Sequence, residues 1–268
     1  MYDNETVAIY RKFAQAHHRL SPYLHTMGAN AMDRGASTLK PLAERHSDSK
    51  APYPEPQTYA YLLGEDILVN PIMRSSEGNL TAVEVKDAVF PSLDDKDTVW
   101  LSWWHPTDAK MAKMVTAKES SKRELLVVPL DAYPVHVRRG ALLPLESAEN
   151  TAKTVFTWFC PDFSAAENES KTAILRESES TGSGMLATAT ISSSSSMEIT
   201  ISARPGPVGV EVVGVTKPSA VVIESGLADA CIHEYLAPTE SVLVSCKDNS
   251  RGTRITVSDV ASSLKFGL

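Results

Sequence analysis

The sequence predicts a mainly β fold, in which one N-terminal helical segment precedes two antiparallel β-sandwich domains. A long helical pattern occurs at residues 3–35, and from about residue 58 apolar and polar residues alternate with a period of two. Turn-rich segments separate many short β-prone runs, which is typical of antiparallel sandwiches. With 268 residues, the chain is long enough for two domains. We expect the helical segment within 1–40, a proximal sandwich at 41–147 and a distal sandwich at 148–268.

The helical segment has a clear start, a break and an end. Asp3 or Asn4 is suited to cap its first turn, and Gly35 is suited to end it. Pro22 cannot donate a hydrogen bond to the preceding turn, so we expect a kink or two consecutive helices there. An apolar stripe about 100° wide runs along the segment and predicts a face that packs on a core. Its members are Tyr10, Phe13, His17, Leu20, Leu24, Met27 and Ala31.

The strand predictions fall into two series. In 197–203, Met197, Ile199 and Ile201 alternate with polar residues, the pattern of a strand with one buried and one wet face. The first series comprises 66–72, 81–90, 98–104, 123–130 and 134–140, and the second comprises 154–159, 186–192, 197–203, 208–215, 219–225, 230–235, 241–246 and 253–259. The polar segment 145–153 is the expected boundary between the sandwiches. The Ser-rich segments 177–185 and 191–197 are interpreted as hairpin tips.

Composition excludes several classes of partner. The net charge is −7 and no run of Lys or Arg exceeds two residues, so there is no electrostatic footprint for nucleic acid or an anionic membrane. The aliphatic stretches are short, as in 220–223, so no membrane span is predicted. No CxxC or CxxH spacing indicates zinc or a redox pair, and we expect no cofactor. Cys231 and Cys246 are compatible with a bridge and equally with two buried thiols; Cys160 lies far from both.

Three histidines lie close together in the helical segment. His17 falls on the apolar stripe, whereas His18 and His25 fall on the opposite side. His18 and His25 are separated by about 10 Å of helical rise, too far for both to bind one ion. We therefore interpret His17 as a half-buried structural residue and the other two histidines as exposed. We expect no metal ligand.

Tryptophans in 98–104 are the candidate sugar contacts. Flat aromatic faces suit the apolar faces of pyranose rings. On a strand, Trp100 and Trp104 share one face and Trp103 takes the other. Because one face of a sandwich strand is core, packing is the favoured interpretation, and sugar stacking on Trp100 and Trp104 is the alternative.

Two charged clusters also have both a functional and a structural interpretation. Asp94, Asp95 and Asp97 could offer oxygen ligands to calcium, but the EF-hand glycine and distal glutamate are missing, so a solvated turn is favoured. Arg138 and Arg139 fall on opposite faces of a strand, which predicts one structural salt bridge and one exposed charge. No G-x-S-x-G elbow supports a serine triad.

Sequons at Asn4, Asn79 and Asn168 would permit glycosylation in a lumenal or secreted protein. Such triplets also arise by chance, and the beginning of the sequence has acidic residues where a secretory signal has basic ones. The sequons slightly favour a lumenal or secreted protein, and the compartment stays open.

Three collinear segments resemble parts of the family 31 glycoside hydrolases. The first is similar to the helix after that family's last barrel strand, the second to its glycine, acid and proline-terminated strand, and the third to its Pro-Val, Arg-x-Gly and terminal Pro signature. The matching residues are Leu20, Pro22, Tyr23, Ala31, Gly35, Lys40, Pro41 and Leu42; then Gly64, Asp66, Leu68, Val69 and Pro71; then Pro134, Val135, Arg138, Gly140 and Pro144. The resemblance covers residues 2–145, and the rest fits the family's distal sandwich in pattern only.

This resemblance implies a retaining α-glycosidase, which needs two carboxylates about 5 to 5.5 Å apart across the scissile bond. The family's nucleophile lies in a Trp-x-Asp-Met-Asn-Glu motif, which this sequence lacks. We therefore expect no catalytic residue in this chain. The helical segment is then the last helix of a (β/α)8 barrel, and the remaining partners are the upstream catalytic barrel and its carbohydrate substrate.

The resulting hypothesis is a C-terminal fragment of an α-glycosidase that supports the barrel and is inactive alone. The start of the sequence is expected to continue a preceding part, because the apolar helix stripe must pack against something. The alternative hypothesis is a stand-alone carbohydrate-binding or adhesive β-sandwich protein without catalysis.

Overall fold

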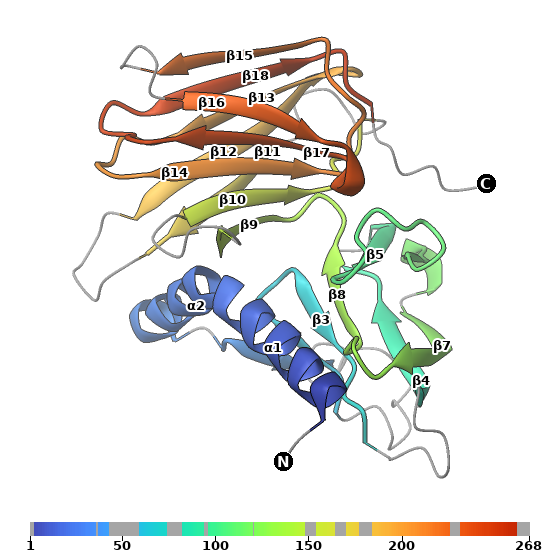
Figure 1. Ribbon diagram of the computed structural model, residues 1–268. Helices are drawn as coiled ribbons and strands as arrows, with labels where there is room; N and C mark the ends of the chain where they lie inside the picture. Colours follow the sequence, from blue (N-terminus) through green and yellow to red (C-terminus); the bar gives the residue numbers. More distant parts are fainter. Residues whose placement is uncertain are drawn as a thin grey trace. The chain divides into compact units, whose positions relative to one another are not determined.

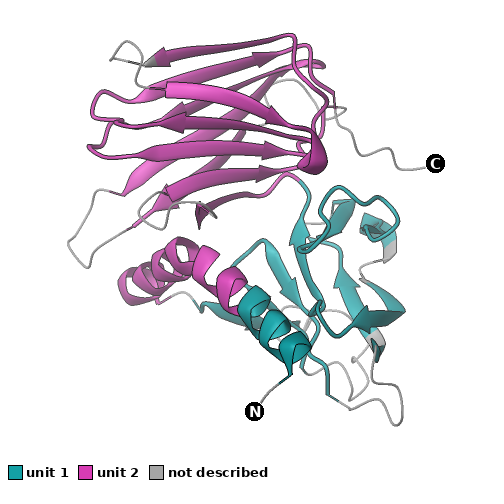
Figure 2. Cartoon of the chain, in the orientation of Figure 1, with its two compact units in different colours: residues 1–13, 36–139 teal, residues 14–35, 140–268 magenta. Residues whose placement is uncertain are grey.

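The computed structural model describes residues 3–35, 37–42, 59–73, 82–93, 96–119, 121–147, 154–163, 170–176, 184–225 and 231–261. Strands predominate and two helices open the chain, so the predicted mainly β fold is confirmed (Figure 1). The chain divides into two compact units (Figure 2). Unit 1 comprises residues 1–13 and 36–139, and unit 2 comprises residues 14–35 and 140–268. No helix in the described ranges is long and apolar enough to cross a membrane.

The helical segment is two consecutive helices, as Pro22 predicts. Helix α1 spans Asn4–Arg19 and helix α2 spans Ser21–Arg34, with the proline in the first turn of α2. Asp3 is the N-cap of α1, because its Oδ1 accepts a hydrogen bond from the Thr6 amide at 2.7 Å. Gly35 ends α2 in the left-handed conformation, with φ 65°, and its amide donates to the Ala31 carbonyl.

The strands of unit 1 form a six-stranded sheet and a two-stranded sheet. In spatial order, the larger sheet comprises β1 (Leu39–Pro41), β2 (Tyr61–Leu63), β3 (Ile67–Val69), β8 (Val135–Arg138), β5 (Thr98–Ser102) and β6 (Lys113–Val115). The smaller sheet pairs β4 (Ala82–Pro91) with β7 (Ser121–Pro129), and a 3-10 turn, Ala117–Glu119, precedes β7. Phe90 and Trp100 are fully buried in one apolar cluster, which also contains Leu62 and Leu68.

Unit 2 contains two five-stranded sheets that enclose one apolar core. The first sheet has the order β16 (Cys231–Leu236), β17 (Ser241–Cys246), β14 (Val208–Val213), β10 (Thr154–Phe159), β9 (Leu142–Glu146). The second has the order β11 (Ser170–Leu175), β12 (Met185–Ser193), β13 (Ser196–Ile201), β18 (Thr253–Ser258), β15 (Ala220–Ser225). Another 3-10 turn, Ala237–Thr239, joins β16 and β17.

The alternation predicted in 197–203 is confirmed, because Met197, Ile199 and Ile201 are all buried in the core of unit 2. The serine run is also a hairpin tip, as predicted: β12 and β13 pair across it, with Ser193 opposite Ser196. Most of the other proposed tip, 177–183, lies outside the described residues. Serine suits such a turn because its short hydroxyl side chain bonds to local backbone; here the Ser193 hydroxyl accepts from the Ser195 amide.

One strand pair departs from the antiparallel prediction. Strands β10 and β14 run parallel, with Thr154 opposite Val208 and Phe159 opposite Val213. Between them the chain forms β11, β12 and β13 in the other sheet before it returns. Parallel neighbours need such a crossover connection, and short-range patterning cannot reveal it.

The division into units differs from the predicted domain limits. Strands β9 and β10 lie on either side of 148–153, yet they pair in one sheet, with Glu146 opposite Thr154. The units divide the chain between residues 139 and 140, and α2 belongs to unit 2. A polar connection is as compatible with a hairpin as with a linker, which is why composition at 145–153 pointed to a boundary.

Candidate functional site

Two of the motif segments meet through an ion pair. Asp66 precedes β3 and Arg138 ends β8, and these strands are neighbours. The Arg138 Nε donates to Asp66 Oδ1 at 2.7 Å, Nη2 lies 2.6 Å from the same oxygen, and the Arg138 amide donates to the Asp66 carbonyl. The structural salt bridge predicted for this arginine pair is therefore confirmed at Arg138. Arg139 is half-buried rather than exposed, because its amide pairs with Val99 in the turn after β8.

The motif glycines occupy turns that require a left-handed backbone. Gly64 has φ 68° and its amide donates to the Thr38 carbonyl at 2.9 Å. Gly140 has φ 78°, a conformation that costs a side-chain-bearing residue about 1 kcal/mol or more. These motif residues therefore shape the backbone of the fold and carry no reactive group.

The apolar stripe of α1 is only partly covered. No residue of α1 is buried, and Tyr10 and Val7 are 74% and 42% exposed. Phe13 contacts unit 1, since its ring meets the Trp104 ring edge to face at a centroid distance of 5.3 Å. Beside it, the Lys12 Nζ lies 2.8 Å from Asp131 Oδ2. Within unit 1, Lys12 and Phe13 thus hold this part of α1 against Asp131 and Trp104, and Tyr10 stays open.

Helix α2, in contrast, packs within unit 2. Tyr23, Thr26 and Met27 are buried, and α2 lies beside β9 and β11. The Thr26 Oγ1 accepts a hydrogen bond from the Arg176 amide at 3.0 Å, and Arg176 also forms an ion pair with Asp33. The expectation that the whole stripe lies against a separate barrel is therefore corrected for α2, because the distal sandwich already covers its inner face.

All three helix histidines are exposed, so the half-buried position expected for His17 is wrong. No residue of α1 is buried, so this part of the stripe does not enclose the imidazole. His18 pairs with Glu146, and the His25 Nδ1 lies 2.8 Å from the Arg176 carbonyl oxygen. These contacts are with protein groups, and the described residues contain no cluster of metal-ligating side chains.

The candidate sugar contacts occupy packed positions. Trp100 is fully buried, and its Nε1 donates to the Pro91 carbonyl at 2.8 Å. Strand β5 ends at Ser102, so the strand alternation does not extend to Trp104. Trp104 is half-buried; its Nε1 donates to the Tyr133 carbonyl at 2.6 Å, and the Lys12 Nζ lies 5.0 Å from its ring centroid. The sugar-contact hypothesis therefore concerns Trp104 alone.

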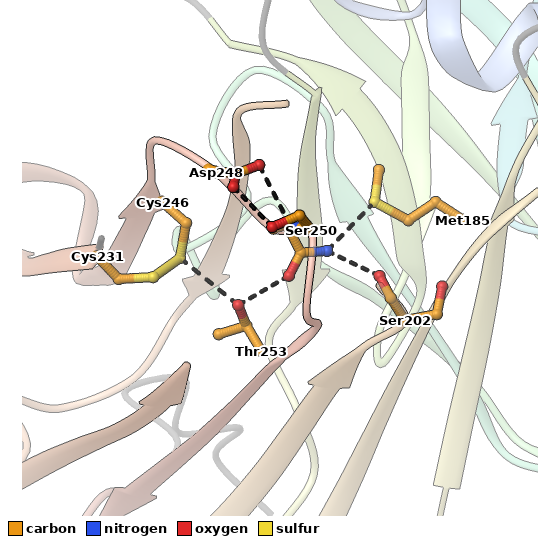
Figure 3. The surroundings of a disulfide bond; sticks show 8 residues. Met185, Ser202, Cys231, Cys246, Asp248, Ser250 and Thr253 are labelled. Atoms are coloured by element: carbon orange, nitrogen blue, oxygen red, sulfur yellow. Dashed lines mark hydrogen bonds between the residues drawn. A yellow bond between two sulfur atoms is a disulfide. The ribbon is translucent and has the colours of Figure 1, made fainter. Parts of the chain in front are cut away.

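The aspartate cluster and the cysteines are the remaining candidates from the sequence. Asp94 and Asp95 lie outside the described residues, whereas Asp97 accepts a hydrogen bond from the Ala117 amide at 2.9 Å. Cys231 and Cys246 form a disulfide (Figure 3), so the bridged alternative is confirmed. These cysteines lie directly opposite in β16 and β17.

A buried polar chain lies behind this disulfide. The Thr253 hydroxyl donates to Asn249 Oδ1 at 2.8 Å, and the Asn249 Nδ2 donates to the Ser202 carbonyl at 2.7 Å (Figure 3). Asp248 accepts from the Ser250 hydroxyl at 2.7 Å; this hydrogen bond is the largest cause that lowers the pKa of Asp248. The network fixes the turn between β17 and β18 and supplies no free nucleophile or acid.

One buried titratable residue escaped the sequence reasoning. His136 is 6% exposed, its ring stands edge-on to Phe90 at 4.9 Å, and its Nδ1 has no hydrogen-bond partner among the described residues. Burial, followed by the nearby Lys113 ammonium, lowers the pKa of His136 to about 4, and Glu124 opposes the shift. The sequence signal for its burial was its position in the predicted strand 134–140.

The site residues thus have structural roles. A comparison with protein families shows what this part of the chain is similar to. Residues 35–143 match the model described as the glycosyl hydrolase family 31 C-terminal domain. This part of the chain is similar to the C-terminal domain of glycosyl hydrolase family 31. The matched residues include all of the continuous segment 36–139 of unit 1 and the two motif segments joined by Asp66 and Arg138.

Several curated proteins are similar to this chain over about half its length. A barley α-glucosidase is 30% identical over 150 residues, covering 56% of the chain and 15% of that protein. The human probable maltase-glucoamylase 2 is 27% identical over 142 residues, 53% of the chain and 5% of that protein. The α-xylosidase of Saccharolobus solfataricus is 24% identical over 144 residues, 54% of the chain and 17% of that protein.

Solved structures extend the similarity of fold to almost the entire chain. The GH31 dextranase of Flavobacterium johnsoniae, solved with isomaltotriose, gives a TM-score of 0.70 at 16% identity over 96% of this chain and 33% of its own. An uncharacterized Listeria monocytogenes protein in complex with glucose gives 0.71 at 15% identity, over 96% of this chain and 24% of its own. The chain therefore spans a small part of these curated relatives and at most a third of these structures.

Proposed function

We propose that this chain is the noncatalytic C-terminal part of a retaining α-glycosidase and that it supports the catalytic barrel of the intact enzyme. The match of residues 35–143 to the family's C-terminal domain carries this proposal. Two curated relatives have the names α-glucosidase and α-xylosidase, so the proposed substrates are α-glucosides or α-xylosides. The contribution of this chain is structural.

The chemistry of the chain supports the noncatalytic part of the proposal. Retaining hydrolysis needs a nucleophilic carboxylate and a second carboxyl that acts as acid and then base. The sequence lacks the Trp-x-Asp-Met-Asn-Glu motif that holds the family nucleophile. Its two motif-associated acids, Asp66 and Glu65, form ion pairs with Arg138 and Lys40. These carboxylates hold strands and turns in place, so they are unsuited to attack a sugar.

The helices support the proposed contact with a barrel. Tyr10 and Val7 of α1 are exposed, while Phe13, which lies beside Tyr10 on the stripe, packs on Trp104. Apolar side chains that remain exposed on a helix with one occupied face favour a second packing partner. In the proposed enzyme this partner is the barrel, with α1 between it and unit 1.

An activity assay on the isolated chain tests the catalytic part directly. We expect no turnover of a chromogenic α-glucoside or α-xyloside above buffer, because the two carboxylates lie elsewhere. Turnover that copurifies with the chain and scales with its concentration would overturn the proposal. The corresponding full transcript is expected to encode the tryptophan-aspartate nucleophile motif upstream of Met1, and its protein product should hydrolyse the same substrates.

A further inference from the structure

We propose that Asn4 is the acceptor of an N-linked glycan and that the protein matures in an oxidising secretory compartment. Asn4, Glu5 and Thr6 form an Asn-x-Thr triplet, in which the asparagine amide is the acceptor group. Two independent structural observations carry the inference: the placement of Asn4 on α1, and the disulfide between Cys231 and Cys246.

Asn4 is exposed on the side of α1 that faces away from unit 1. It precedes Phe13 by nine residues, which at about 100° per residue places the two on opposite sides of the helix. Phe13 is the residue that packs on Trp104. Tyr10 follows Asn4 by six residues, a rotation that separates them by about 120°. A glycan on Asn4 therefore points away from the contact between Phe13 and Trp104 and is well separated from Tyr10.

The disulfide indicates the compartment. Cys231 and Cys246 oppose each other in β16 and β17, so the two strands bring their side chains together in register. Cys246 is 3% exposed, which shields the bond from reductants on the core side. Disulfides persist in secreted and lumenal proteins and are rare in the reducing cytosol. The secretory lumen is also the place where sequons are modified, so the two features agree.

Both modifications can be written as balanced reactions with reactants of that compartment. The Asn4 amide nitrogen bonds to the anomeric carbon of a lipid-diphosphate oligosaccharide. The bond between that carbon and the diphosphate oxygen breaks, the nitrogen loses one proton, and the lipid diphosphate leaves. For the disulfide, Cys231 and Cys246 lose two protons and two electrons to a protein disulfide oxidant, which is reduced to its dithiol.

Peptide mapping of the protein from the cells that make it tests the inference. The protein is captured with an antibody, alkylated without reduction, digested with trypsin and treated with N-glycosidase in heavy-oxygen water. We expect the peptide that ends at Arg11 to carry heavy aspartate in place of Asn4, and Cys231 to be linked to Cys246. An unmodified Asn4 peptide, or alkylated thiols at the two cysteines, would overturn the inference.

Sequon variants of the full chain provide a matched control in a eukaryotic secretory host. In a background of Asn79→Gln and Asn168→Gln, a single glycan reports on the first sequon alone. Thr6→Ser keeps the acceptor triplet, whereas Thr6→Ala removes it; Thr6 is exposed, so both variants are expected to fold. We expect a glycosidase-sensitive mobility shift for Thr6→Ser and none for Thr6→Ala. Identical mobility of the two variants before and after glycosidase would contradict the assignment.

Discussion

At the residue scale, Trp104 packs against α1 within unit 1. Its ring meets Phe13 on one side, its Nε1 donates to Tyr133, and the Lys12 ammonium lies near its face. A contact between two aromatic rings and a contact between a cation and a ring each stabilise a protein by about 0.5–1.5 kcal/mol. The ring surfaces that would stack on a pyranose are thus partly occupied by the protein's own side chains.

We predict that Trp104→Ala lowers the free energy of unfolding by about 2 kcal/mol, because it removes a half-buried aromatic ring and its contacts. The measurement is chemical denaturation of the full chain, with Leu125→Ala at an exposed position as the control. The same samples run in affinity gels with soluble α-glucan should show no tryptophan-dependent retardation. Retardation that disappears in a Trp104→Ala protein of normal stability would instead support the carbohydrate-binding alternative.

His136 makes the stability of the chain depend on pH. Burial, followed by Lys113, lowers the pKa of His136 to about 4, from an ordinary value of 6.5. Between these values the unfolded chain binds a proton that the folded chain does not. Stability is therefore full above about pH 6.5 and falls as the pH is lowered toward 4.

We predict a loss of up to about 3 kcal/mol in unfolding free energy across this window from His136 alone. Denaturation curves at several pH values measure it. His136→Leu should flatten this part of the pH dependence, whereas His233→Leu, at an exposed position, should leave it unchanged. Parallel pH profiles for the wild type and His136→Leu would show that the buried imidazole is not the cause.

Residue patterns predicted some contacts and missed others for physical reasons. The opposing faces of a strand were enough to expect a salt bridge at one member of the Arg138 and Arg139 pair. Its partner, Asp66, lies 72 positions away in β3, and no local pattern connects such residues. The burial of His136 likewise depends on Phe90 from another strand. The cysteine pair stayed ambiguous because its geometry depends on the register of β16 and β17.

At the element scale, the disulfide holds an edge strand in place. β16 lies at the edge of its sheet and has three exposed residues in the middle, so few apolar contacts hold it there. We predict that Cys231→Ser with Cys246→Ser lowers the unfolding free energy by about 3 kcal/mol, the magnitude typical for a loop of some 15 residues. Hydrogen exchange should become faster in β16 first.

A matched control for this element is reduction of the wild-type chain, which should reproduce the behaviour of the double serine variant. Cys160 is buried and has no part in the bridge, so Cys160→Ala should not abolish the effect of reductant. Equal exchange rates in β16 before and after reduction would show that strand pairing alone suffices.

Element types were predictable wherever the pattern extended over several residues. Each of the 13 predicted strand segments overlaps an observed strand, and the two helices, their cap and their break follow from Asp3, Pro22 and Gly35. The missed strands include β1, β2 and β6, each of three residues, which is too short for a period to be visible. β9 is buried along its whole length, so it does not alternate.

At the scale of the whole molecule, the long-range contacts change how the helices are interpreted. The sequence predicted one continuous stripe against one partner. The structure instead assigns α2 to unit 2, where the Arg176 amide and Thr26 meet, and leaves the open flank on α1. Only the long-range contacts of α2 with β9 and β11 could reveal this difference, because the helix pattern itself is the same in both halves.

The proposed barrel contact makes opposite predictions for the isolated chain and the intact enzyme. Tyr10→Ser should leave the stability of the isolated chain within about 0.5 kcal/mol, since the side chain is exposed. In the intact enzyme the same change should cost about 1–3 kcal/mol, because it removes buried apolar surface. Thermal denaturation of both proteins measures the difference, and Arg11→Ala, next to it on the helix, is the control. Equal effects in the two proteins would contradict a partner at this flank.

The parallel pairing of β10 and β14 sets a limit on shortened forms of this protein. β14 lies between β10 and β17, and it is reached only after the chain has completed β13 in the opposite sheet. A premature stop near residue 207 would leave one sheet with β9 and β10 alone and the other without β15 and β18. Splice forms or frameshifts of this kind would yield no half-sized sandwich, and their products are expected to be cleared by quality control or to aggregate.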